Sequence, residues 1–108
     1  MSEPRLKTGI WVGAYVRRCH TSDAPAFVTH KGDPDAGAVV IAIDRLDGTQ
    51  RVYNRARDGE GRLIFAPLTD WVDPLAAQAA IERQIRFDPD LWVIAVESRS
   101  GDAFLDDY

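Results

Sequence analysis

The segment at residues 73–98 constrains the fold more than any other part of the chain, and it reads DPLAAQAAIERQIRFDPDLWVIAVES. Asp73 can cap the free backbone amides at the start of a helix, and Pro74 suits the first helical position because its missing N–H costs nothing there. Pro89 disfavours helical geometry at the residue before it, so the helix must end at that point. The apolar, β-branched run Leu91–Val96 then predicts a strand in the core.

The predicted helix has one apolar face. Ala77, Ile81 and Ile85 recur at helical spacing and should pack on the core. Trp92, on the strand that follows, is predicted to lie in the same core. The segment contains no recognisable catalytic signature.

A second helix and several more strands follow from similar patterns. Val12, Tyr15, Val16 and Cys19 recur at helical spacing, which predicts an amphipathic helix over residues 8–20. The dipeptide Asp47-Gly48 predicts a hairpin turn, because glycine supplies the positive φ that a two-residue loop requires. The remaining apolar runs predict strands at residues 26–30, 38–44, 50–55 and 63–65, a flexible tip at 56–62, and a final edge strand or tail at Phe104 and Leu105.

These elements predict a single α+β domain over residues 1–108. We expect a mostly antiparallel, twisted sheet of about four to six strands, with two helices packed on one face. The composition, 45% hydrophobic and 28% charged, is that of an ordinary globular domain. The length allows such a domain to bury most of its apolar surface around one core.

The charge balance argues against some classes of partner. The 17 acidic and 13 basic residues give a formal net charge of −4, which does not favour bulk attraction to nucleic acid or to an anionic membrane. No run approaches the roughly 18 apolar residues of a membrane span, and the first residues do not have the pattern of a signal peptide. The single cysteine, Cys19, cannot form an internal disulfide. We therefore expect a cytoplasmic protein that does not bind membranes.

Four stretches of the chain resemble a known family. They are IWVGAYVRRC, GDPDAGAVVI, DRLDG and IRFDPDLWVIAVE, and they are spread over nearly the whole chain. They resemble a family of small proteobacterial proteins catalogued only as a domain of unknown function. The last stretch, in which a helix breaks at FDPDLW, is the most specific. The resemblance implies a small cytoplasmic domain and no particular activity, cofactor or catalytic residue.

Arginine and aromatic residues form the first candidate binding site. Arg51, Tyr53 and Arg55 alternate along one predicted strand and therefore share one of its faces. An aromatic ring between cations suits contact with an acidic peptide or with nucleic acid. The alternative is a solvated sheet face whose arginines pair with the protein's own carboxylates. Trp71 lies in a predicted loop and is the tryptophan most expected to be exposed, and exposed aromatic residues can anchor a partner.

Two aspartate pairs form an alternative, acidic site. Asp33 and Asp35 in KGDPDAG, and Asp88 and Asp90 in FDPDLW, each flank a proline. Their carboxylates could bind a divalent cation or act as an acid–base pair. We prefer a structural interpretation, in which both segments are turns, because Gly, Pro and Asp are typical turn residues.

A zinc site or a reactive thiol is not favoured. Cys19, His20 and His30 could supply three ligands, but neighbouring helical residues such as Cys19 and His20 point about 100° apart. Cys19 lies on the predicted apolar face, where a buried, inert thiol is expected. The glycine-containing segments GDPDAG and DGEGR lack the patterns of phosphate-binding loops. We expect no metal and no cofactor.

Three functions remain open. We prefer a small non-enzymatic interaction or regulatory module that binds a protein partner or a second copy of itself through residues 50–55 and Trp71. The second is a metal-dependent hydrolase, which requires at least three of the aspartate and histidine side chains to meet in one cleft. The third is an RNA- or DNA-contact module, which requires a coplanar set of arginines: Arg17, Arg18, Arg51 and Arg55.

Overall fold

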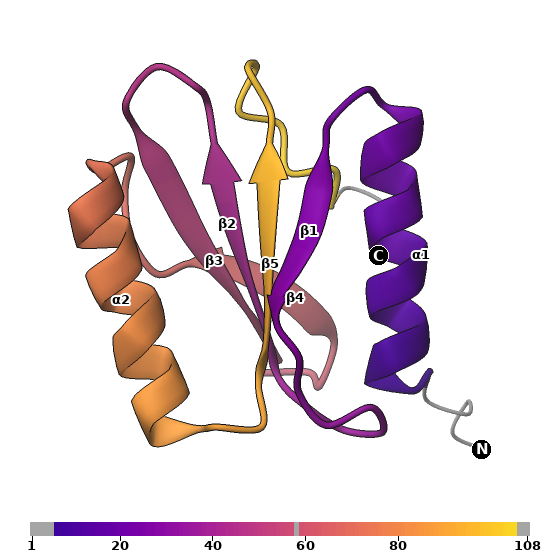
Figure 1. The fold of residues 1–108 in the computed structure, drawn as a ribbon. Helices are drawn as coiled ribbons and strands as arrows, with labels where there is room; N and C mark the ends of the chain where they lie inside the picture. The colour runs from indigo at the N-terminus through magenta and orange to yellow at the C-terminus, as the bar shows by residue number, and fades with distance from the viewer. Residues whose placement is uncertain (1–5, 58, 106–108) are drawn as a thin grey trace.

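A five-stranded mixed sheet forms the centre of the molecule, with a helix on either side (Figure 1). The computed structural model describes residues 6–57 and 59–105. Along the sheet the strand order is β1-β5-β2-β3-β4. In chain order the elements are α1 (Thr8–Thr21), β1 (Ala26–His30), β2 (Val39–Asp44), β3 (Gln50–Arg57), β4 (Leu63–Pro67), α2 (Pro74–Phe87) and β5 (Trp92–Glu97).

Most of the strand pairs are antiparallel, as predicted. β1 with β5, β2 with β3, and β3 with β4 are antiparallel, whereas β2 and β5 are parallel. The parallel pair forms because the chain leaves β2, completes β3, β4 and α2, and returns as β5 beside β2. The α+β class and the mostly antiparallel sheet are therefore confirmed.

The two helices lie on opposite faces of the sheet, so the prediction that both pack on one face is wrong. Val39, Ile41 and Ile43 of β2 pack with α1, while Val40 and Ala42 of the same strand pack with α2. Side chains alternate between the two faces of a strand, and both sets of this strand are apolar. A sheet whose central strands are apolar on both faces needs cover on both.

The ends of α2 have the structure that the sequence predicts. The Asp73 carboxylate accepts a hydrogen bond from the Ala76 amide at 2.8 Å and so caps the helix, and Pro74 is its first residue. The helix ends at Phe87, immediately before Asp88 and Pro89. Both boundaries follow from local chemistry, so no distant contact is needed to explain them.

The β2–β3 connection lies where the turn was predicted but is longer than two residues. β2 ends at Asp44 and β3 begins at Gln50, and the Arg45 amide donates to the Thr49 carbonyl across the loop. Leu46 and Gly48 both adopt positive φ, at 62° and 92°. Residues 56 and 57, which were predicted to belong to a flexible tip, are part of β3.

Each helix covers only part of its face of the sheet. α1 runs alongside β1, and α2 runs alongside β3, at opposite sides of the molecule (Figure 1). On the α1 side, this leaves a half-face over β3 and β4 that α1 contacts at Thr8 and Trp11. On the α2 side, it leaves a half-face over β1 and β5. The residues after β5 form no strand in the described part of the chain. Ala103, Phe104 and Leu105 instead pack against the α1-side core.

Candidate functional site

The alternation of β3 places Arg51, Tyr53 and Arg55 on the α1 side of the sheet, as the sequence predicts. Tyr53 packs against the α1-side core, and the Arg55 guanidinium contacts Thr8 of α1. All three side chains are half-buried. They lie on the half-face over β3 and β4, which α1 reaches at Thr8 and Trp11, and this half-face is the candidate site.

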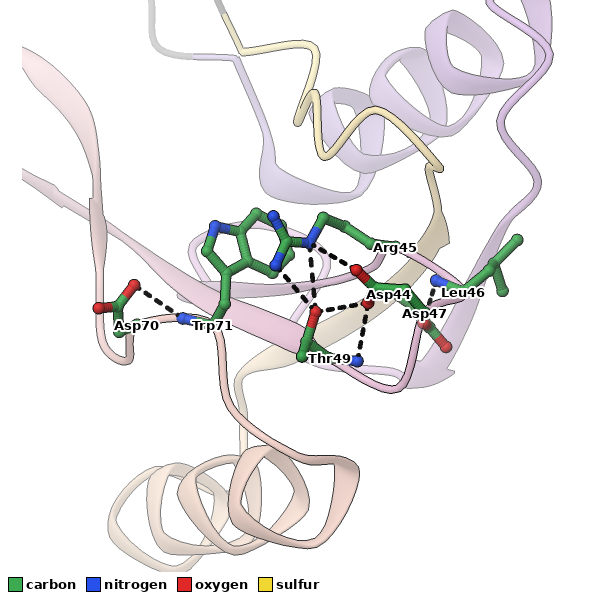
Figure 2. A network of polar contacts seen from close by, with 7 residues as sticks. All are labelled: Asp44, Arg45, Leu46, Asp47, Thr49, Asp70 and Trp71. Atoms are coloured by element: carbon green, nitrogen blue, oxygen red, sulfur yellow. Dashed lines mark hydrogen bonds and ion pairs between the residues drawn. The ribbon is translucent and has the colours of Figure 1, made fainter.

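Trp71 joins this group from the loop that precedes α2. Val72 pairs with Gln50 at the start of β3 through two backbone hydrogen bonds of 2.8 and 2.9 Å, which hold the loop against the sheet. The Asp70 carboxylate accepts from the Trp71 amide at 2.8 Å (Figure 2). Trp71 is half-buried, whereas Trp11 and Trp92 are 8% and 6% exposed. Trp71 is therefore the most accessible of the three tryptophans, although it is not fully exposed.

Two arginines stack against the Trp71 indole. The Arg45 guanidinium carbon lies 3.8 Å from the centre of the indole, and Figure 2 shows the two groups side by side. The Arg51 guanidinium carbon lies 5.9 Å from Trp71 and 5.6 Å from the Tyr53 ring. All three distances fall within the range of cation–π attraction. We call Arg45, Arg51, Tyr53, Arg55 and Trp71 the arginine–aromatic surface.

The β2–β3 loop holds Arg45 in this position. Nε and Nη2 of Arg45 donate to the Thr49 hydroxyl at 3.2 and 3.0 Å, and Nε lies 3.6 Å from the Asp47 carboxylate (Figure 2). The Asp47 carboxylate in turn accepts from the Thr49 hydroxyl at 2.6 Å. That hydrogen bond is the main cause that lowers the pKa of Asp47 from its ordinary value. The contact between Arg45 and Trp71 was not predicted from the sequence, because it joins two loops far apart in the chain.

Arg51 and Arg55 are held differently. Nε of Arg51 donates to the Thr69 carbonyl at 3.2 Å, and its two terminal nitrogens have no partner among residues 6–57 and 59–105. Nη2 of Arg55 donates to the Thr8 hydroxyl and to the Gly37 carbonyl at 3.2 and 3.1 Å. Arg55 therefore ties the start of α1 to the sheet, while Arg51 presents donors to solvent.

Stacked aromatic rings continue from this surface toward α1. The Trp11 ring lies 5.8 Å from the Arg55 guanidinium carbon. The same ring stacks on Phe65 of β4 at 5.4 Å and on Tyr15 at 5.1 Å. Phe65 is the residue opposite Arg55 in the β3–β4 register. The cations of the surface thus lie along a row of packed aromatic rings.

The two aspartate pairs meet through their backbones. The Asp33 amide donates to the Asp90 carbonyl at 2.8 Å, so the two loops lie side by side. Two of the carboxylates are used locally: Asp33 accepts from the Asp35 amide, and Asp88 accepts from the Asp90 amide, both at 3.2 Å. The Asp35 carboxylate lies 3.7 Å from Nζ of Lys7. Within the described residues, no three Asp, Glu, His or Cys side chains gather closely enough to hold a metal ion.

The arginines of the nucleic-acid hypothesis lie apart. Nη1 of Arg18, in the last turn of α1, donates to the Phe104 carbonyl at 3.3 Å, whereas Arg55 contacts Thr8 at the first residue of α1. Ten residues of helix separate those two contacts, which corresponds to about 15 Å. Arg17 is exposed on the same helix.

Cys19 lies in the core, and each histidine ring contacts a backbone carbonyl. Cys19 is fully buried, as predicted, and burial raises the pKa of its thiol. Nε2 of His20 lies 3.1 Å from the Ala26 carbonyl, and Nδ1 of His30 lies 2.8 Å from the Leu91 carbonyl.

These features define a small α+β domain that carries an arginine–aromatic surface on one half of its sheet. No helix in the described part of the chain is long and apolar enough to cross a membrane. A model of a family described as "Protein of unknown function (DUF1491)" matches residues 6–106. The chain therefore belongs to the DUF1491 family, which confirms the resemblance to a domain of unknown function.

Solved structures of similar proteins have the same fold. The crystal structure of a DUF1491 family protein from Caulobacter crescentus CB15 is 39% identical, covers 94% of this chain and 96% of its own, and superposes with a TM-score of 0.87. An NMR structure of a DUF1491 family protein from Caulobacter crescentus CB15 gives 39% identity, 96% coverage of both chains and a TM-score of 0.85. Protein Atu0922 from A. tumefaciens is 30% identical over 88% of this chain and 87% of its own, with a TM-score of 0.78. A search of curated protein sequences gave no match.

Proposed function

We propose that this protein is a non-enzymatic interaction module that binds an acidic segment of a partner protein on its arginine–aromatic surface. The observation that carries the proposal is the stacking of Arg45 and Arg51 on the Trp71 indole, on the half-face over β3 and β4. We also propose a cytoplasmic location, which the buried thiol of Cys19 supports because a free cysteine persists in a reducing compartment.

The chemistry of this surface suits carboxylates. A guanidinium that stacks on a ring keeps its N–H donors in the plane of the group, where they can bind a carboxylate through two parallel hydrogen bonds. Arginine, tryptophan and tyrosine are also the residues that contribute most binding energy at protein interfaces. Arg51 has donors available, because only its Nε is engaged within the described residues.

The overall charge favours a local, specific contact. At a formal net charge of −4, an acidic partner is repelled by the molecule as a whole and attracted only where the arginines gather. A partner must therefore make close contact with the arginine–aromatic surface to bind.

The test compares capture of a partner by three forms of the full chain. Arg51→Glu reverses a charge on the surface, and Arg83→Glu makes the same change at an exposed position on α2, on the other side of the sheet. Each protein is used as bait in nuclease-treated lysate from the source cells, and retained proteins are quantified. We expect a stoichiometric protein that the wild type and Arg83→Glu retain, and that Arg51→Glu retains at least about tenfold less. Equal retention by all three proteins would overturn the proposal. So would a capture from untreated lysate that recovers nucleic acid and no protein partner.

A further inference from the structure

The segment after β5, residues 99–105, already occupies part of the α1 side, and we call it the tail. The segment after β5 crosses from the end of the sheet toward α1 (Figure 1). A side-chain carbon at Gly101 would lie 3.1 Å from the Trp71 indole and 3.2 Å from Cδ of Arg45. The tail therefore begins against two members of the arginine–aromatic surface.

The tail is held mainly through its backbone carbonyls. The Tyr15 hydroxyl donates to the Ala103 carbonyl at 2.7 Å, and Nη1 of Arg18 donates to the Phe104 carbonyl at 3.3 Å. The side chains of Phe104 and Leu105 pack against the α1-side core. Backbone acceptors are common to every peptide, so these two donors can serve another extended segment equally well.

The conformation of the tail is unfavourable at Phe104. This residue has a φ of 56°, which a bulky L residue rarely adopts, and a hydrogen bond from its amide to the Asp102 carboxylate at 2.8 Å holds it there. A segment that binds without this strain can compete with the tail.

A cavity beside the tail has room for such a segment. It has a volume of about 350 Å³ and lies at the carboxyl end of β5, between Ser98, Pro25 and Phe104. Asp23 and Leu46 also line it, and their φ angles of 60° and 62° are again in the left-handed region. Within the described ranges, 6–57 and 59–105, the non-glycine residues with a positive φ are Asp23, Leu46 and Phe104. Backbone strain gathered around one cavity is typical of a binding site.

We propose that the tail is a resident occupant of this face, and that the partner segment which replaces it has the same chemistry: an apolar pair between carboxylates. The tail sequence DAFLDD has this pattern. This inference rests on the proposed function and names the class of segment that the arginine–aromatic surface and the adjacent cavity receive. Carboxylates of the incoming segment face Arg18, Arg45 and Arg51, and its apolar pair takes the place of Phe104 and Leu105.

A labelled peptide with the sequence of residues 100–108 is the probe, and its affinity is measured by fluorescence anisotropy. In the wild-type chain the tail competes with the probe, so only the small fraction of molecules with a released tail can bind the probe. The double change Phe104→Ala and Leu105→Ala weakens the tail and should tighten probe binding by about tenfold or more. The matched control, Leu75→Ala with Phe87→Ala, removes two apolar side chains of α2 that are 84% and 80% exposed and should leave the affinity as in the wild type.

Two further arms make the test decisive. A probe in which lysine replaces each aspartate should not bind any of the proteins. Asp102→Ala removes from the tail the carboxylate that accepts from the Phe104 amide, while the probe keeps its own aspartate. This variant should also tighten probe binding, and it replaces the double change if that does not fold. The inference is overturned if the weakened-tail variant and its control bind the probe equally, or if the lysine probe binds as well. If the peptide test fails in this way but Arg51→Glu still loses the partner in the capture test, the proposed function stands. If Arg51→Glu keeps the partner but the peptide test succeeds, the proposed function is overturned and the exchange of the tail stands.

Discussion

The half-face over β3 and β4 on the α1 side differs from the half-face over β1 and β5 on the α2 side in what covers its apolar atoms. On the α1 side, Arg45 and Arg51 lie over the Trp71 indole, and the tail adds Phe104. On the α2 side, Phe27 of β1 is 54% exposed. Beside it a groove of about 330 Å³ runs between α2 and the sheet, with Ile85 and Ala95 among its lining residues.

The two half-faces differ in how apolar sheet surface is treated where the helix does not cover it. Long arginine side chains cover apolar surface with their stems and keep their charged heads in water. The result on the α1 side is a surface that is both apolar and charged, which suits specific recognition. The α2 side presents scattered apolar residues such as Phe27, and single exposed apolar residues are ordinary on globular proteins.

The largest difference in unfolding free energy should appear between the variants Trp92→Ala and Ile85→Ala. Trp92 is 6% exposed, packs in the α1-side core, and donates through Nε1 to the Asp33 carbonyl at 2.8 Å. Its replacement should cost about 3–5 kcal/mol of unfolding free energy, measured in urea. Ile85 was predicted from the sequence to be a core residue, but it is only partly buried at the groove, so Ile85→Ala should cost about 1 kcal/mol. Equal costs would show that the groove is packed as tightly as the core.

The next largest difference should appear between Trp71→Ala on the α1 side and Phe27→Ala on the α2 side. Trp71→Ala removes a half-buried ring and two cation–π contacts, and we expect a loss of about 1–2 kcal/mol. Phe27→Ala should change the unfolding free energy by no more than about 0.5 kcal/mol. A larger loss at Phe27 that grows with protein concentration would contradict the comparison, because it would mean that a second copy covers the β1 half-face.

A smaller effect on the unfolding free energy should come from Asp47 in the β2–β3 loop, and it should depend on pH. The hydrogen bond from the Thr49 hydroxyl lowers the pKa of Asp47, so the folded state favours the ionised carboxylate. The stabilisation is therefore present above the ordinary carboxyl pKa and is lost as the pH falls through the lowered value. Asp47→Asn should be less stable than the wild type at pH 7, and the difference should shrink toward pH 3. A difference that does not change with pH would show that ionisation of Asp47 does not stabilise the loop that carries Arg45.

The smallest effect on stability should appear at alkaline pH and involves Cys19. Burial raises the pKa of the thiol above its ordinary value of 9.0. The neutral thiol is favoured in the folded state, so its stabilisation is complete below that pH and is lost as the pH rises through the raised value. The wild type should lose more stability than Cys19→Ala above pH 9.0. Thiol labelling of the native protein at pH 8 should be slow, and rapid labelling would contradict the buried position.

Much of the fold could be predicted because its signals are local. The cap at Asp73, the stop at Pro89 and the alternation of β3 all depend on residues within a few positions of one another. The same alternation is sufficient to predict that Arg51 and Arg55 share one face of the strand. The hairpin at Asp47-Gly48 was predicted at the right place but too short, because Arg45 and Thr49 also belong to the loop.

The error in helix placement also has a physical cause. The sequence shows that Val39–Asp44 is apolar at almost every position, and an apolar strand of this kind needs cover on both faces. Which helix takes which face depends on where the connecting segments run in space, and no short-range signal encodes that path. The prediction of one covered face gave too little weight to the pattern of β2.

Some features of the candidate site also follow from the sequence alone, and others depend on tertiary packing. The order of the amino acids is enough to establish the helices, the strands and the shared face of Arg51, Tyr53 and Arg55, because backbone geometry sets the direction of each side chain within one element. Packing of the folded chain is what stacks Arg45 on Trp71, lets Arg18 and Tyr15 hold the tail, and puts α1 and α2 on opposite faces. Arg45 and Trp71 are 26 positions apart in the chain, and Tyr15 and Ala103 are 88 positions apart. Contacts between such distant residues form only when the whole chain is packed.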